Sequence, residues 1–148
     1  MPTIKNPAYF ANKTVLVTGG SDGIGKALVE LLLNAGAKVA TCGRNSDKLY
    51  QLQLHNPGAS LFTMVGDVSS ETDCANLINA VIKNFGAIDI LINNAGIVML
   101  AEFKDVSLDT IRQVMDINFW GVLYTTKFAL PHIIASRGNI IGVSSIAG

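Results

Sequence analysis

The sequence predicts an α/β fold built on a doubly wound parallel sheet. Short β-branched runs alternate with segments whose apolar residues recur at helical spacing, and little sequence is left between them. The polar and glycine-rich clusters all follow the ends of predicted strands. Because parallel strands end at the same edge of a sheet, we expect these clusters to meet at one ligand-binding edge.

Composition narrows the class of protein. The 148 residues suit a single domain over 1–148, and 49% of them are hydrophobic against 15% charged, which is typical of a core-rich globular enzyme. Lys+Arg and Asp+Glu balance at 11 each, which argues against a nucleic-acid or anionic-membrane partner. The chain shows neither a secretory signal nor an apolar run long enough to cross a bilayer, so we expect a cytoplasmic protein.

Neither the cysteines nor the histidines form a metal-binding pattern. Cys42 falls in an apolar strand and Cys74 on the apolar face of a helix, which predicts two buried, reduced thiols. His55 and His132 have no Cys or His neighbour at ligand spacing. No metal site is predicted.

Five strands and four helices are predicted in alternation. The predicted strands are 14–18, 38–42, 60–65, 88–92 and 139–143. The predicted helices are 24–35, 46–55, a third from the Ser70 cap to Gly86, and a long one from the Ser107 cap towards Ala135, with bends near Gly121 and Pro131. We expect the first strand at the centre of the sheet, with neighbours added on both sides.

A glycine-rich turn follows the first strand and opens the first helix. It reads Thr18-Gly19-x-x-x-Gly23-Ile24-Gly25. Glycines there let the backbone approach a pyrophosphate, and the helix amides that follow favour phosphate. The turn therefore predicts a pyrophosphate site, although its spacing differs from the common G-x-G-x-x-G fingerprint, with a plain tight turn as the alternative. A Walker-type loop is excluded because Ala27 follows Lys26.

Four motifs together resemble those of the short-chain dehydrogenases/reductases. Residues 18–25 are similar to the cofactor signature of that family, and Asn93-Asn94-Ala95-Gly96 is similar to its second signature. Asn118 matches the catalytic-asparagine segment, and Ser144-Ser145-Ile146-Ala147-Gly148 matches the segment that holds the catalytic serine. The motifs occur in the family's order and spacing over nearly the whole chain.

The resemblance implies a set of cofactor contacts. They are Thr18, Gly19, Ser21, Asp22, Gly23, Ile24, Gly25, Arg44, Asp67, Val68, Asn94, Ala95 and Gly96. Asp67 and Val68 would contact the adenine, although a solvated turn aspartate remains the alternative. Asn93 either bridges strand ends or contacts the ligand.

The residues after the second strand favour NADP(H) over NAD(H). Gly43 stands where NAD-preferring members of the family carry Asp, and the guanidinium of Arg44 can pair with a 2′-phosphate. An exposed surface arginine is the alternative. Asp22 opposes this preference, because many NADP-preferring relatives place a second basic residue at its position.

Asn118 and Ser145 are the candidate catalytic residues. We expect Asn118 on an inward stripe with Ile111, Met115, Val122 and Ala129, where a buried amide needs partners. The resemblance implies that it disturbs the helix and that the freed carbonyl holds a water of a proton relay; a structural core asparagine is the alternative. Ser145 would hydrogen-bond a substrate carbonyl, with Ser144 or a simple turn as alternatives.

The resemblance implies an oxidoreductase that moves hydride between nicotinamide and a small-molecule carbonyl or alcohol. The family's Tyr-x-x-x-Lys acid/base pair is expected downstream of Ser145, and the sequence stops at Gly148. We therefore expect the C-terminal strands to be missing and this chain alone to be inactive. A non-catalytic dinucleotide-binding or assembly module remains the alternative. The open edge at 139–143 invites pairing with another chain, so we expect a homo-oligomer.

Overall fold

A single parallel sheet organises the protein. The structure is a computed structural model that describes Ile4 and residues 6–145. Its strands are β1 (Thr14–Thr18), β2 (Lys38–Gly43), β3 (Leu61–Val65), β4 (Ile90–Asn93) and β5 (Asn139–Gly142). They lie in the order β3-β2-β1-β4-β5, and every pair is parallel. The predicted central place of β1 and the doubly wound sheet are confirmed.

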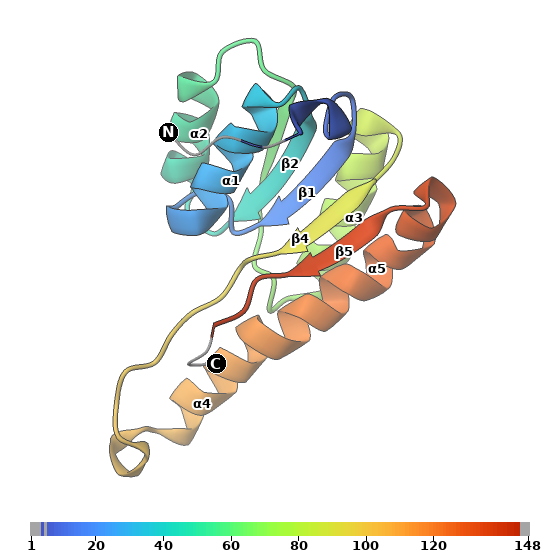
Figure 1. Cartoon of the computed structure of the whole chain (residues 1–148). Helices are drawn as coiled ribbons and strands as arrows, with labels where there is room; N and C mark the ends of the chain where they lie inside the picture. The colour runs from blue at the N-terminus through green and yellow to red at the C-terminus, as the bar shows by residue number, and fades with distance from the viewer. Residues whose placement is uncertain (1–3, 5, 146–148) are drawn as a thin grey trace.

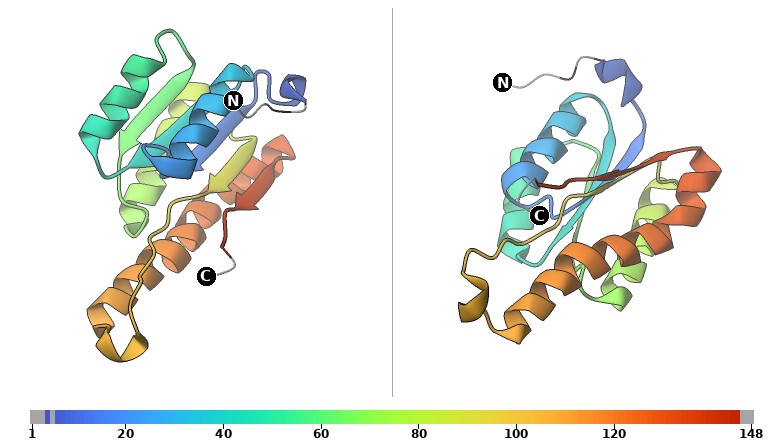
Figure 2. Two further views of the ribbon diagram at one scale, coloured as in Figure 1. Left: turned by 60° about the vertical axis from the view of Figure 1, so that its left-hand side comes forward. Right: turned by 60° about the horizontal axis from the view of Figure 1, so that its bottom comes forward.

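Helices cover both faces of the sheet (Figure 1). They are α1 (Gly23–Asn34), α2 (Ser46–His55), α3 (Glu71–Phe85), α4 (Leu108–Met115) and α5 (Gly121–Ser136), with short 3-10 turns at Pro7–Tyr9 and Phe103–Asp105. Helices α1 and α2 lie on one face, and α3 and α5 lie on the other, as the views of Figure 2 also show. Within the described residues, no helix has the length and apolarity that a bilayer crossing requires.

Alternate strand residues feed two separate hydrophobic cores. Val15 and Val17 of β1 pack with Val29 of α1, whereas Leu16 between them packs with Leu91 and the residues of α3 and α5. All of β1 is buried, as expected for a central strand covered by helices on both sides.

The predicted helix caps at Ser70 and Ser107 form. Ser70 and Ser107 accept hydrogen bonds from the backbone amides three residues later, and Gly86 ends α3 in the left-handed conformation. Asp73 does not complete the capping box at Ser70, because its Oδ2 accepts from the Asp67 amide at 2.9 Å instead. The carboxylate therefore fixes the turn after β3 rather than the start of α3.

The prediction of an inward Asn118 is wrong. A π-helical turn, η3 (Asp116–Trp120), joins α4 to α5, and it adds a residue to one turn. The extra residue rotates the buried stripe onto Ile117, Gly121, Thr125, Ala129 and Ile133. Asn118 is exposed, and Met115 is 47% exposed. The helix irregularity thus begins just before Gly121, whereas Pro131 lies inside α5.

Strand β5 forms one edge of the sheet, and it is exposed along its length. Ile140 and Ile141 are 40% and 45% exposed. The open apolar edge expected at 139–143 is therefore present among the described residues. Unpaired strand edges of this kind favour pairing with a further strand.

Leu91→Ala tests the core that joins the sheet to α3 and α5. Leu91 is fully buried, so its loss leaves a cavity, and we expect the free energy of unfolding to fall by about 2–5 kcal/mol. Ile134→Ala is the matched control, because Ile134 is 67% exposed and should change stability by about 0.5 kcal/mol or less. Urea unfolding of both variants measures the difference; equal losses would contradict the assignment of the core.

Candidate functional site

One pocket of about 510 Å³ lies at the carboxyl ends of the strands. All predicted cofactor-binding residues except Thr18 line it: Gly19, Ser21, Asp22, Gly23, Ile24, Gly25, Arg44, Asp67, Val68, Asn94, Ala95 and Gly96. The structure thus brings four separate segments of the chain to one place, as their positions after the strands predict.

The glycine turn forms the floor of the pocket. Gly19 and Gly23 have φ of +69° and +51°, which side chains rarely adopt. A Cβ on Gly25 would stand 2.2 Å from the Gly19 carbonyl oxygen, whereas a Cβ on Gly23 would meet nothing within 4 Å. Gly25 therefore permits the tight turn, and the open space beside Gly23 lets a ligand reach the backbone.

Two buried threonine hydroxyls hold this turn in place. Thr41 Oγ1 accepts from the Gly20 amide at 2.9 Å and donates to the Val17 carbonyl at 2.7 Å. Thr18 Oγ1 accepts from the amides of Asn94 and Ala95, both at 3.0 Å. Thr18 therefore stabilises the pocket without lining it. Thr41 was missed by the sequence analysis, although a hydroxyl in an apolar strand could have signalled it.

The two asparagines after β4 have different roles. Asn94 Nδ2 donates to the Thr18 carbonyl at 2.9 Å, so it joins the end of β4 to the glycine turn. Asn93 is buried; its amide accepts from Thr125 Oγ1 at 2.7 Å and donates to Thr126 Oγ1 at 3.0 Å. Asn93 thus ties β4 to a helix, α5, and not to another strand end, and it does not line the pocket.

The turn after β3 orients the Asp67 carboxylate. Its Oδ1 accepts from Ser69 twice, from the amide at 3.0 Å and from Oγ at 2.8 Å. The other oxygen, Oδ2, has no hydrogen-bond partner among the described residues. Asp67 and Val68 line the pocket, so an acceptor oxygen and an apolar wall lie at this end of it.

Charged side chains surround the rim where β2 meets the glycine turn. A Cβ on Gly43 would lie 2.7 Å from Ser21 Oγ, so these two segments touch. The residues that follow them, Arg44 and Asp22, both line the pocket. Arg44 is exposed and forms no ion pair within the part of the chain that the structure describes.

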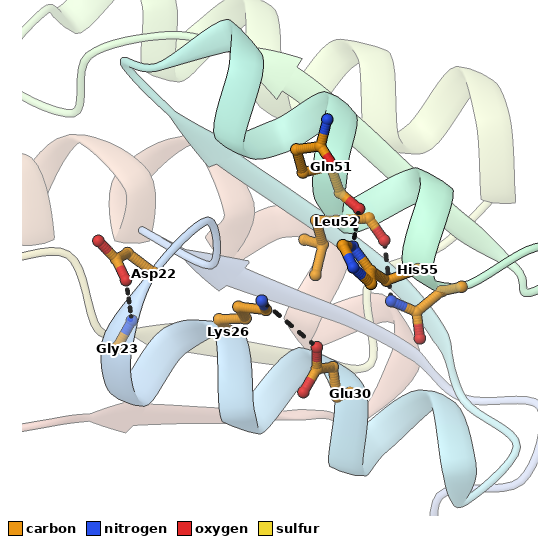
Figure 3. Close-up of polar contacts among 8 residues, drawn as sticks. Asp22, Gly23, Lys26, Glu30, Gln51, Leu52 and His55 are labelled. Carbon is orange, nitrogen blue, oxygen red and sulfur yellow. Dashed lines mark hydrogen bonds and ion pairs between the residues drawn. The ribbon is translucent and has the colours of Figure 1, made fainter.

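Asp22 is already paired with a cation. It caps α1 by accepting from the Gly23 amide at 2.8 Å, as Figure 3 shows. Its other oxygen contacts the ammonium of Lys48 on α2. The Lys48 hydrogen bond, followed by the Gly23 amide, holds the pKa of Asp22 below its usual value. The negative charge of Asp22, which was expected to oppose a 2′-phosphate, is therefore balanced by the positive charge of Lys48. The sequence alone did not suggest Lys48.

The side chain of Asn118 forms two hydrogen bonds with the backbone of Ile97. Its Oδ1 accepts from the Ile97 amide and its Nδ2 donates to the Ile97 carbonyl, both at 2.9 Å. The π-helical turn is thereby fastened to the loop after β4, and Ile97 itself lines the pocket. Asn118 does not line the pocket.

The serine pair lies at the same edge of the sheet. Val143 lines the pocket, and Ser144 and Ser145 follow it as exposed residues that do not line it. The rest of the matched segment, residues 146–148, lies outside the described residues.

No tyrosine among the described residues lines the pocket. Tyr9 and Lys13 have the Tyr-x-x-x-Lys spacing, but the Tyr9 hydroxyl contacts Asn139 at 3.3 Å, at the start of β5. This is the end of the sheet opposite Ser145. Tyr124 stacks on Trp120 with ring centroids 5.8 Å apart. Position thus excludes both as acid/base partners of the pocket.

The two cysteines are buried free thiols, which confirms the sequence prediction. Burial raises the pKa of the Cys42 thiol to about 11 and that of Cys74 to about 12. Cys42 lines the pocket, yet at neutral pH its thiol is protonated and a poor nucleophile.

Thr41→Val tests the support of the glycine turn. Valine keeps the shape but removes the acceptor of the buried Gly20 amide, so we expect a loss of about 1–3 kcal/mol in the free energy of unfolding. Thr41→Ser keeps both hydrogen bonds and is the control. Urea unfolding should rank the chain first, the serine variant second and the valine variant last; a valine variant as stable as the serine variant would contradict the assigned role.

The buried thiols predict a loss of stability in alkali. Unfolding returns them to their ordinary pKa, so the native state binds more protons than the unfolded state between about pH 9 and 11. The free energy of unfolding should therefore fall as the pH rises through this range. The Cys42→Ala/Cys74→Ala variant should show a shallower fall by urea unfolding at pH 8, 9 and 10; the same slope in both proteins would contradict the prediction.

Comparison with known proteins agrees with the geometry. Residues 13–148 match the family model described as short chain dehydrogenase. The chain is 37% identical over 139 residues to 11-beta-hydroxysteroid dehydrogenase-like 3 of Arabidopsis thaliana, covering 91% of this chain and 45% of the plant protein. It is 35% identical over 140 residues to L-fucose dehydrogenase of Bos taurus, covering 94% and 51%.

A solved structure agrees in fold as well. A short-chain dehydrogenase/reductase of unknown function from Caenorhabditis elegans, crystallised with cofactor, superposes with a TM-score of 0.86 at 37% identity, over 94% of this chain and 55% of the nematode chain. The chain spans about half the length of the relatives it matches. The family match over residues 13–148, together with the strand-end pocket, shows that this chain belongs to the short-chain dehydrogenase family.

Proposed function

We propose that the chain is the NADP(H)-binding part of an oxidoreductase that interconverts a carbonyl and an alcohol. The observation that carries this proposal is the composition of the pocket. A glycine cradle lies at one side, and at the rim lie a compensated carboxylate and an arginine that has no ion pair among the described residues. NADP(H), when bound, supplies the hydride donor or acceptor.

The residues present fit such a cofactor. The open space beside Gly23 and the amides at the start of α1 suit a pyrophosphate. The available Oδ2 of Asp67 can accept from an adenine amino group, and Val68 can pack on the ring. Arg44 would hold the 2′-phosphate.

Ser145 would hydrogen-bond the substrate oxygen, with Ser144 as the neighbouring candidate. Asn118 would keep the pocket wall at Ile97 in place. The named relatives are dehydrogenases, which supports an alcohol or carbonyl as substrate and does not select one. A homo-oligomer remains part of the proposal, and it rests on the open edge of β5.

We also propose that these 148 residues alone turn over little substrate. No tyrosine of the described residues lines the pocket, and the loss of a general acid/base costs about 10²- to 10⁴-fold in rate. The same observation favours the second candidate function, a dinucleotide-binding module without catalysis. Oxidation of NADPH by this chain with carbonyl substrates would contradict both statements.

Arg44→Gln tests the cofactor choice. We expect calorimetric titration to show that the chain binds NADP more tightly than NAD. The variant should lose about ten- to hundredfold in affinity for NADP, because a charge-assisted bidentate pair is removed, and should bind NAD as before. Arg112→Gln is the matched control, since Arg112 lies on α4 and pairs with Asp109 at 2.8 Å. Equal losses for both dinucleotides, or none for NADP, would argue that Arg44 is only a surface residue.

A further inference from the structure

The Asp22–Lys48 pair joins the start of α1, which lines the pocket, to the start of α2, which follows the lining residue Arg44 in the chain. Asp22 is the cap of α1, and Lys48 lies in the first turn of α2. Their side chains are 70% and 52% exposed. An exposed pair of this kind adds little to stability, so stability alone gives no reason for its place.

The backbone of Lys48 is held close to Arg44. Asn45, the residue after Arg44, caps α2 by accepting from the Lys48 amide at 2.9 Å. Leu49, the residue after Lys48, is buried under the helix. The turn that presents Arg44 to the pocket therefore also fixes the start of the Lys48 side chain, and Asp22 fixes its other end.

Lys48 changes the balance of charge between Arg44 and Asp22. Without it, Arg44 and Asp22 would cancel, and a carboxylate would face the phosphate directly. With it, two cations stand against one carboxylate. An ammonium group carries three hydrogen-bond donors, so contact with Asp22 leaves donors for a second anion.

We propose that Lys48 is a second determinant of NADP(H) preference: Asp22 holds its ammonium at the pocket rim, where it binds the 2′-phosphate together with Arg44. Asp22 is then a positioning residue and not an obstacle to the phosphate. The proposal rests on the proposed function and adds a residue from a different helix to it.

Lys26 provides a matched control. It lies on α1 one turn after Asp22 and pairs with Glu30 at 3.9 Å, as the dashed line in Figure 3 marks. Neither lysine lines the pocket, but Lys48 contacts Asp22, which does, whereas Lys26 pairs with Glu30. Lys26→Gln and Lys48→Gln therefore remove the same charge from neighbouring positions, and only the second removes it from the partner of Asp22.

The experiment is calorimetric titration of NADP and of NAD into the whole chain and into Lys48→Gln, Lys48→Arg and Lys26→Gln. Lys48→Gln should bind NADP about tenfold more weakly and NAD within about twofold of the unsubstituted chain, because NAD carries no 2′-phosphate. Lys48→Arg keeps the charge and should retain most of the affinity for NADP. Lys26→Gln should leave both affinities within about twofold.

Unchanged NAD binding shows that each variant is folded. An affinity for NADP that is the same in Lys48→Gln and in the unsubstituted chain overturns this proposal and leaves the proposed function intact. Equal weakening of both dinucleotides, or equal weakening of NADP by Lys48→Gln and Lys26→Gln, also overturns it. A chain that binds neither dinucleotide overturns the proposed function and this proposal together.

Discussion

The attachment of the glycine turn to the strand ends is the constraint on which the rest of the site depends. The turn gains no hydrophobic burial of its own, so hydrogen bonds must fix it. Thr41 holds the Gly20 amide from β2, and Asn94 holds the Thr18 carbonyl from the end of β4. A Cβ on Gly19 would stand 2.9 Å from the Ala95 Cα, so the two motifs touch. Because three strands converge on one turn, its amides keep a fixed direction, and they can bind an anion without first being ordered.

The electrostatics of the rim depend on tertiary contacts and not on residue type alone. Taken alone, the Asp22 carboxylate opposes a 2′-phosphate. Paired with Lys48, it leaves a net positive charge over Asp22, Lys48 and Arg44. The pair costs little and contributes little to folding, as is usual for exposed ions. Its effect is expected on ligand choice instead, since a bound phosphate excludes water from the rim and strengthens each charge interaction there.

Much of the fold and of the pocket could be predicted from the sequence because both follow from local signals. The apolar runs set the strands, Ser70 and Ser107 cap helices as expected, and glycine and polar clusters mark the strand ends. Side-chain partners far apart in sequence could not be predicted. Lys48 lies 26 residues from Asp22, and Thr41 lies 21 residues from Gly20. The misplaced Asn118 has another cause: a regular helical period cannot account for the extra residue of a π-helical turn, although the family resemblance did imply a disturbed helix at Asn118.

We propose that the glycine turn after β1 binds the diphosphate of a dinucleotide. Amide NMR spectra of the chain during titration with NADP test this most directly. Saturable shifts should be largest for the amides of Gly19, Gly23 and Gly25, with further shifts at Asp67 and Val68 and little change on the outer surface of α5. Absence of saturation, or shifts gathered away from the strand ends, would contradict the account.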